Sequence, residues 1–277
     1  MYSPLFVAKK VANTKVFKYP EYKLGVVPKT DIPVVLNLHD AISHHIALIG
    51  VTGSGKSFLA REIIREILQD IKIICIDFTG EYEKEMQNLS PQKIDSGNLE
   101  EFMKDNNHFA IFELPELSNT SEIITKTEEF IAGIFKFAKG NSNQRICLLL
   151  EEAHTIIPES GFLGDLGDFG KTKAIVNKIG QVALQGRKYG VGLMVIGQRT
   201  ANISKTILTQ CNTMVCFQAF DDTNFNFLGN YIGKDMAMTL PTMKKYHAIV
   251  AGKALKSDLP LIVDVARNNT NGQISDK

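Results

Sequence analysis

Gly50-Val51-Thr52-Gly53-Ser54-Gly55-Lys56-Ser57 matches the pattern G-x-x-x-x-G-K-[ST] at every fixed position. The apolar run His45–Ile49 precedes it and indicates a buried strand, and Phe58–Leu68 follows with apolar residues at helical spacing. Phosphate binding needs backbone N–H groups that converge on one point, which glycines allow without a Cβ clash, and a helix N-terminus that faces the anion. The stretch therefore predicts a site for a nucleoside triphosphate, although a glycine-rich turn with an accidental lysine is the alternative.

The motif also assigns roles to single residues. Lys56 is expected to reach the β- and γ-phosphates, and the Ser57 hydroxyl is expected to bind magnesium. The expected cofactors are ATP and Mg²⁺. The residues predicted to contact the nucleotide are Gly50, Thr52, Gly53, Ser54, Gly55, Lys56, Ser57 and Phe58.

The composition fits a globular protein with a substantial core, because 277 residues with 44% hydrophobic side chains can bury one. No apolar run approaches the ~18 residues of a membrane span, and the first residues do not form a basic leader with an apolar segment. We therefore expect a soluble, cytoplasmic protein without a membrane partner. Four cysteines without C-x-x-C spacing are expected to be reduced thiols, mostly in the core.

A formal net charge of +1 hides a strong asymmetry along the chain. Between Asp77 and Phe130 there are thirteen acidic residues and four lysines, whereas Phe169–Phe220 contains no acidic residue and seven lysines and arginines. Such a segment could present a basic surface to a polyanion. Solvated faces that pack against acidic neighbours are an equally good interpretation of the charges alone.

Apolar runs alternate with helical patterns, which predicts an α/β fold with a mainly parallel central sheet flanked by helices. We expect residues 1–30 to form an N-terminal arm, 31–266 the ATPase domain and 267–277 a polar tail. The predicted helices are Phe58–Leu68, Ser121–Ala138, Lys171–Arg187 and Thr223–Tyr231. The predicted strands are Ile46–Ile49, Ile71–Ile76, Ala110–Phe112, Ile146–Leu150, Gly192–Ile196, Met214–Phe217, Ala248–Val250 and Leu261–Val263.

Polar residues follow three of these strands. Glu151 and Glu152 come directly after Ile146–Leu150, and we predict Glu152 to be the general base that polarises water and Glu151 to hold magnesium-bound water. Asp77 and Gln198 follow two further strands, and Gln198 could sense the γ-phosphate. Because open α/β sheets bind ligands at the carboxyl ends of their strands, these residues are expected to share one site. Surface glutamates and ordinary polar turns are the alternatives.

In these motifs the chain resembles the HerA-type ATPases of the FtsK/HerA superfamily, which are RecA-like P-loop enzymes that translocate on double-stranded DNA. The resemblance runs from about residue 31 to 264 and rests on an ordered set of short motifs. These are Ile49–Ser57, Asp77-Phe78-Thr79-Gly80-Glu81-Tyr82, Leu150-Glu151-Glu152-Ala153-His154, Gly186-Arg187-Lys188-Tyr189-Gly190, Gly197-Gln198-Arg199 and Ile203–Leu208 followed by Cys211-Asn212-Thr213.

The resemblance implies a homo-hexameric ring that hydrolyses ATP at subunit interfaces and passes DNA through a central pore, often with a nuclease or other effector partner. It implies ATP and magnesium at Lys56 and Ser57, metal contacts at Asp77 and Glu151, Glu152 as catalytic acid/base and Gln198 as sensor. Arg187 would be an arginine finger inserted into the neighbouring subunit's site. A phosphate-contacting arginine or a surface arginine is the alternative.

Two features depart from this family. A small β-barrel domain usually precedes the phosphate loop, whereas fewer than fifty residues precede Gly50 here. We therefore expect a truncated or minimal version, or a barrel supplied elsewhere. Many related ATPases have Asp-Glu where this chain has Glu151-Glu152, and the longer Glu151 side chain favours a water-mediated contact with magnesium.

The leading expectation for function is an ATP-driven motor that translocates on or unwinds double-stranded DNA. Lys171, Lys173 and Lys205 are candidate contacts with the phosphate backbone, because they lie in the segment without acidic residues. A conjugation or secretion ATPase that moves protein is an alternative. A small-molecule kinase is another, but it needs an acceptor pocket and lid arginines, and the region after the loop is rich in acidic residues instead.

Overall fold

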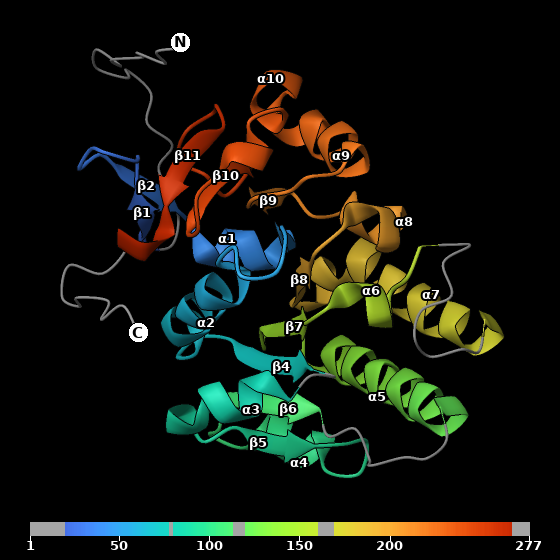
Figure 1. Ribbon diagram of the computed structural model, residues 1–277. Coiled ribbons are helices and arrows are strands. Elements are labelled where there is room, and N and C mark those ends of the chain that lie inside the picture. The colour runs from blue at the N-terminus through green and yellow to red at the C-terminus, as the bar shows by residue number, and fades with distance from the viewer. Residues whose placement is uncertain (1–19, 78–79, 113–119, 160–168, 268–277) are drawn as a thin grey trace.

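A computed structural model describes residues 20–77, 80–112, 120–159 and 169–267. In this part of the chain a single eleven-stranded sheet has the order β2-β1-β11-β10-β9-β3-β8-β7-β4-β6-β5. Helices lie on both of its faces (Figure 1). Five of the ten neighbouring pairs join strands that are not consecutive in sequence, as crossover connections produce.

Seven neighbouring strands, β9 to β5 in that order, run parallel. Most of their residues are buried, which explains why they are continuous apolar runs instead of alternating patterns. The prediction of an α/β fold with a mainly parallel sheet is confirmed. The bounds are β3 Ile46–Ile49, β4 Lys72–Ile76, β5 Gln92–Ile94, β6 Phe109–Phe112, β7 Ile146–Leu150, β8 Val191–Gly197 and β9 Thr213–Cys216.

The other four strands extend the sheet in antiparallel pairings: β1 Tyr22–Val26, β2 Pro33–Leu36, β10 His247–Gly252 and β11 Leu261–Asp264. Strand β1 corrects the expectation of an arm over residues 1–30, because Tyr22–Val26 pairs with both β2 and β11. The short run YKLGV contains a lysine and a glycine, so its pattern did not indicate a strand. Its Leu24 and Val26 are nevertheless buried.

Alternate residues of the strands build two hydrophobic clusters, one on each face of the sheet. Ile46 and Leu48 belong to the cluster of α1 and α2, whereas Ala47 and Ile49 belong to that of α5, α7 and α9. The helix bounds are α1 Leu38–Ser43, α2 Lys56–Ile67, α3 Glu81–Glu85, α4 Leu99–Lys104, α5 Thr120–Gly140, α6 Ala153–Ile156, α7 Phe169–Gln185, α8 Lys205–Leu208, α9 Asp222–Ile232 and α10 Lys234–Ala237.

Helix α7 ends two residues earlier than the predicted Lys171–Arg187, and a 3-10 turn, η2 Gly186–Tyr189, follows it. A Cβ at Gly186 would lie 2.7 Å from the carbonyl oxygen of Val191, so the chain can turn back onto β8 only with glycine here. Arg187 is therefore on a tight turn. All four cysteines are buried free thiols, as expected. None of the helices in the described segments is long and apolar enough to cross a lipid bilayer.

Candidate nucleotide-binding site

The phosphate loop connects the carboxyl end of β3 to the first residue of α2. Its backbone is fixed by neighbouring strand ends, since the Gly50 N–H donates to the Gly197 carbonyl (3.1 Å) and the Val51 N–H to the Gln218 carbonyl (2.8 Å). Gly53 and Gly55 have φ values of 79° and 117°, which other residues rarely adopt. A Cβ at Gly50 would lie 2.5 Å from the Cβ of Phe217. Gly50 is thus required by the close approach of Phe217, whereas Gly53 and Gly55 are required by their backbone conformation.

Lys56 is the first residue of α2 and only 6% exposed. Its Nζ donates a hydrogen bond of 3.1 Å to the carbonyl of Val51, inside its own loop. Burial lowers the pKa of Lys56, while the nearby carboxylates Glu152 and Glu151 raise it. The hydroxyl of Ser54 is buried in the same loop without a hydrogen-bond partner among the described residues. A lysine bound to a carbonyl and a donor without an acceptor both fit a site for phosphate oxygens.

Two aromatic residues border the loop. The ring of Phe58, which was predicted to contact the nucleotide, lies edge-on to the ring of Tyr246 with 5.1 Å between centroids. The Tyr246 N–H donates to the Ser54 carbonyl (2.9 Å), and its backbone has a positive φ of 66°. Sequence reasoning did not identify Tyr246, because it lies far from the loop in sequence and no motif surrounds it.

The loop and the polar residues that follow β8, β7 and β4 meet at one edge of the sheet, because β3, β8, β7 and β4 are adjacent and parallel. The structure therefore brings together the loop, Gln198, Glu151, Glu152 and Asp77. Ser57, in the first turn of α2, and Thr52, exposed on the loop, belong to the same edge.

Glu151 is buried, with 4% exposure, and one of its carboxylate oxygens, Oε2, has no hydrogen-bond partner among the described residues. Burial raises the pKa of this carboxyl to about 7, and the charges of Glu152 and Asp77 add to the effect, whereas Tyr82 and Lys56 oppose it. A buried carboxylate oxygen without a hydrogen-bond partner is costly, and a cation or a proton would stabilise it. This is the chemistry expected of a residue at a metal–nucleotide site.

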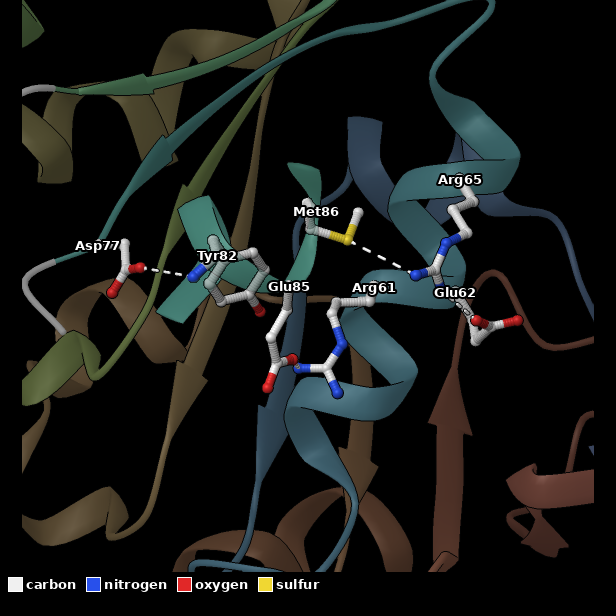
Figure 2. Close-up of polar contacts among 7 residues, drawn as sticks. All are labelled: Arg61, Glu62, Arg65, Asp77, Tyr82, Glu85 and Met86. Atoms are coloured by element: carbon white, nitrogen blue, oxygen red, sulfur yellow. Dashed lines mark hydrogen bonds and ion pairs between the residues drawn. The ribbon is translucent and has the colours of Figure 1, made fainter. Parts of the chain in front are cut away.

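The Asp77 side chain is oriented by α3, as Figure 2 shows. Its Oδ2 accepts a hydrogen bond of 2.9 Å from the Tyr82 N–H. Helix α3 is itself tied to α2, because Arg61 pairs with Glu85 and Arg65 contacts the sulfur of Met86. The fully buried Tyr82 places its hydroxyl near the Glu151 carboxylate and lowers the pKa of that carboxyl. Tyr82 is a second residue near the site that sequence reasoning did not assign a role.

Glu152 adopts a left-handed backbone conformation (φ 43°, ψ 55°) just before α6. Its Oε1 accepts a 2.7 Å hydrogen bond from the Gln198 amide, and its Oε2 lies 3.4 Å from Nδ1 of His154. His154 lowers the pKa of Glu152 most; burial opposes this, and Gln198 and Lys56 also lower it. The side chain is thus favoured in its charged form and held next to the phosphate loop. A positive φ is unusual for glutamate and indicates a backbone held for its site.

Arg187 lies at the opposite edge of the sheet from the loop of its own chain. It precedes β8, whereas the loop follows β3, and these two strands are parallel. The side chain is exposed. Burial lowers the pKa of His44 and His45, which precede β3, and the charge of Arg187 adds a smaller effect in the same direction. Of the predicted site residues, Arg187 is the one catalytic candidate that the structure separates from the rest.

The three lysines predicted to contact DNA differ in their surroundings. Lys173 is exposed on α7. Lys205 is half-buried, and its ammonium group donates to the Thr200 carbonyl and lies 5.0 Å from the centre of the Phe227 ring. The side chain of Lys171 lies outside the described residues.

Three comparisons with known proteins bear on this site. The sequence profile described as "Helicase HerA, central domain" matches residues 22–152, which include the phosphate loop, Asp77, Glu151 and Glu152. The chain is 28% identical over 123 residues to the DNA double-strand break repair helicase HerA of Pyrococcus furiosus, an alignment that covers 43% of this chain and 20% of that protein. The family profile thus matches the part of the chain in which the first three of the quoted motifs occur.

Over residues 22–152, the chain thus matches the central domain of a HerA-type P-loop ATPase. It spans about a fifth of the length of the first curated relatives that it matches. This HerA-type domain shares its fold with the genome packaging NTPase B204 of Sulfolobus turreted icosahedral virus 2, solved with ATP-gammaS, with a TM-score of 0.56 and 17% identity over 81% of this chain and 97% of that one. VirB4 of Thermoanaerobacter pseudethanolicus gives a TM-score of 0.62 with 10% identity, over 88% and 95% of the two chains. The RecA-like fold is thereby confirmed.

Proposed function

We propose that this HerA-type domain hydrolyses ATP and uses the energy to move along or unwind double-stranded DNA, as a ring of identical subunits. The observation that carries the proposal is the charged Glu152 carboxylate, bound to Gln198 and placed at the strand edge that holds the phosphate loop. A loop alone accounts for nucleotide binding; an ionised carboxylate next to it adds a base for hydrolysis.

The residues present fit a magnesium–nucleotide complex. Ser57 at the start of α2 and the carboxylates Glu151 and Asp77 would hold the ion, and the unpartnered Oε2 of Glu151 supports this assignment. Bound Mg²⁺ would neutralise negative charge on the phosphate oxygens. Lys56 would exchange its bond to the Val51 carbonyl for phosphate oxygens, and Glu152 would accept a proton from the attacking water.

We further propose that Arg187 completes the active site of a neighbouring subunit. Within the described residues, Lys56 is the one lysine or arginine that lowers the pKa of both Glu151 and Glu152, and Arg187 lies at the opposite edge of the sheet. A heterologous, head-to-tail contact between copies would bring these two edges together and would close into a ring. An arginine supplied in this way can add about 10³ to 10⁵ in rate.

Exposed Lys173, and Lys171 beside it in sequence, are the proposed contacts with the DNA backbone, because they lie on α7 in the segment without acidic residues. Lys205 is a weaker candidate, since its ammonium group would first have to leave the Thr200 carbonyl and the Phe227 ring. A nuclease or other effector partner also remains part of the proposal.

Steady-state ATP hydrolysis with and without linear duplex DNA tests this function. We expect duplex DNA to raise the turnover number several-fold at low salt and less at high salt, because backbone contacts weaken as counterions accumulate. Lys56→Ala provides the background rate. A turnover number that duplex DNA does not change at any salt concentration would contradict the proposal and favour an ATPase that moves protein.

A further inference from the structure

The imidazole of His45 joins two elements on either side of Arg187. It is 3% exposed and lies just before β3. Its Nε2 is 2.9 Å from the carbonyl oxygen of Ala183 in the last turn of α7, and its Nδ1 is 2.9 Å from the backbone nitrogen of Leu193 in β8. A buried histidine with both ring nitrogens in hydrogen bonds is held in one orientation.

These two partners fix the tautomer. A backbone N–H can only donate and a carbonyl can only accept, so Nδ1 is the acceptor and Nε2 carries the proton. Ala183 is among the last four residues of α7, whose carbonyls lack partners within the helix. The imidazole thus bonds to a helix carbonyl and a strand N–H at once, and it can do so only in its neutral form.

Arg187 lies in the segment between Ala183 and Leu193. The His45 side chain bonds to the residues at both ends of this segment. The segment turns sharply, since Gly190 has a φ of 76° and a Cβ there would lie 2.5 Å from the Gln144 carbonyl oxygen. Its outer surface is open: Leu184 is 62% exposed, and Leu184, Gln185, Arg187, Lys188 and Tyr189 line a surface hollow of about 670 Å³. Behind Arg187 the segment is held by the Ile146 N–H, which donates to the Gly190 carbonyl (2.9 Å), and by the Tyr189 ring, which packs against Phe135. At its two ends it is held by His45.

The backbone of His45 connects this segment to the phosphate loop. His45 has a positive φ of 63°, its carbonyl accepts a hydrogen bond of 3.3 Å from the Thr213 N–H, and β3 runs from the next residue to the loop. His45 therefore contacts the helix before Arg187 and the strand after it, and it directly precedes β3, the strand that leads to Gly50. A positive φ is unusual for histidine and is kept only where the surrounding structure holds it.

We propose that His45 is a positioning residue for Arg187: its neutral imidazole holds the segment 184–192 against the strand that carries the phosphate loop, so that each subunit presents its arginine at a fixed place to its neighbour. This inference rests on the proposed trans role of Arg187. The simpler reading, a histidine that only stabilises the core, predicts that its loss weakens the chain's own nucleotide site as well.

Mixed assemblies separate these two readings. We expect His45→Ala to lower turnover about 10- to 100-fold, the scale of a misplaced catalytic group, while its own phosphate loop still works. Mixing it with Lys56→Ala, which lacks a working loop but keeps its arginine, should then restore hydrolysis. Mixing it with Arg187→Ala should restore none, because neither subunit presents a well-placed arginine.

The opposite pattern overturns the inference. If His45→Ala recovers with Arg187→Ala but not with Lys56→Ala, the damage lies in its own nucleotide site. Recovery with neither partner, while Arg187→Ala and Lys56→Ala do rescue each other, also counts against it. If those two reference variants fail to rescue each other in intact rings, the proposed trans role fails first.

Amide hydrogen exchange tests the positioning without relying on hydrolysis. His45→Ala should exchange at least several-fold faster over residues 184–192, with little change over residues 50–57. His45→Gln, which keeps a donor and an acceptor, should restore part of the protection and of the turnover. Unchanged exchange over 184–192 in both variants would show that the imidazole does not hold the segment.

Discussion

Glu152 is held by two neighbours at the carboxyl end of β7. Gln198 and His154 keep its carboxylate charged and fix its direction next to the loop. Glu152→Gln removes the charge with little change in shape, so we expect unchanged ATP affinity and a turnover number lower by about 10² to 10⁴. Equilibrium nucleotide binding and steady-state hydrolysis measure the two effects. Glu100→Gln, an exposed glutamate on α4, is the matched control, and full turnover in Glu152→Gln would remove Glu152 as the base.

Glu151 makes the free protein less stable as the pH rises. Its folded-state pKa of about 7 exceeds the ordinary value of 4.5, so the folded chain binds more protons than the unfolded chain between these values. The free energy of unfolding should therefore fall from pH 5 to pH 8, by up to about 3 kcal/mol from this group. Urea unfolding with EDTA and without nucleotide measures this. Glu151→Gln should gain stability over the natural chain as the pH rises; parallel pH profiles would contradict the raised pKa.

Much of the site follows from the sequence at the scale of single residues. Lys56, Glu151, Glu152 and Gln198 each follow or begin an element that an apolar pattern defines, and parallel strands bring such positions together. Tyr82, Tyr246 and His45 were not assigned roles. Their contacts with Glu151, Ser54 and Ala183 join distant segments, and no local spacing of residue types encodes such contacts.

At the scale of elements, the phosphate loop offers a comparison between two glycines with positive φ. A Cβ at Gly53 would meet nothing within 4 Å, whereas one at Gly55 would lie 2.9 Å from Cδ1 of Tyr246. Gly53→Ala should therefore cost only backbone strain, about 1–2 kcal/mol. Gly55→Ala should cost more, because Tyr246 must also move. Urea unfolding without nucleotide gives both values, and equal losses would argue against the Tyr246 contact.

The sequence predicts long elements better than short ones. Strands such as β7 and helices such as α5 carry enough apolar residues for their period to be visible. The missed strands β1, β2 and β5 have three to five residues, and only a part of each is buried. These strands form because they pair with a neighbouring strand, and not because of a pattern of their own. In β1, for example, Val26 pairs with Asp264 of β11.

At the scale of the whole molecule, the segment without acidic residues forms α7, η2, β8, α8 and β9. If exposed Lys173 contacts the DNA backbone, Lys173→Ala should weaken binding to all duplex sequences alike and reduce the slope of log affinity against log salt by about 1. Fluorescence anisotropy over a series of salt concentrations measures that slope. Lys104→Ala, in the acidic region, is the control, and an unchanged slope in Lys173→Ala would exclude this contact.

The central claim is that one subunit's phosphate loop, Glu151 and Glu152 work with Arg187 of the next. Arg187→Ala and Lys56→Ala should each be inactive alone, for different reasons, while a mixed ring contains interfaces that pair an intact loop with an intact arginine. For random equal mixing that is about a quarter of all interfaces, so the mixture should recover up to about a quarter of the natural rate. Hydrolysis measured in the mixture, with ring assembly checked by mass, is the most direct test. Recovery supports the account, and intact mixed rings that stay inactive would contradict it.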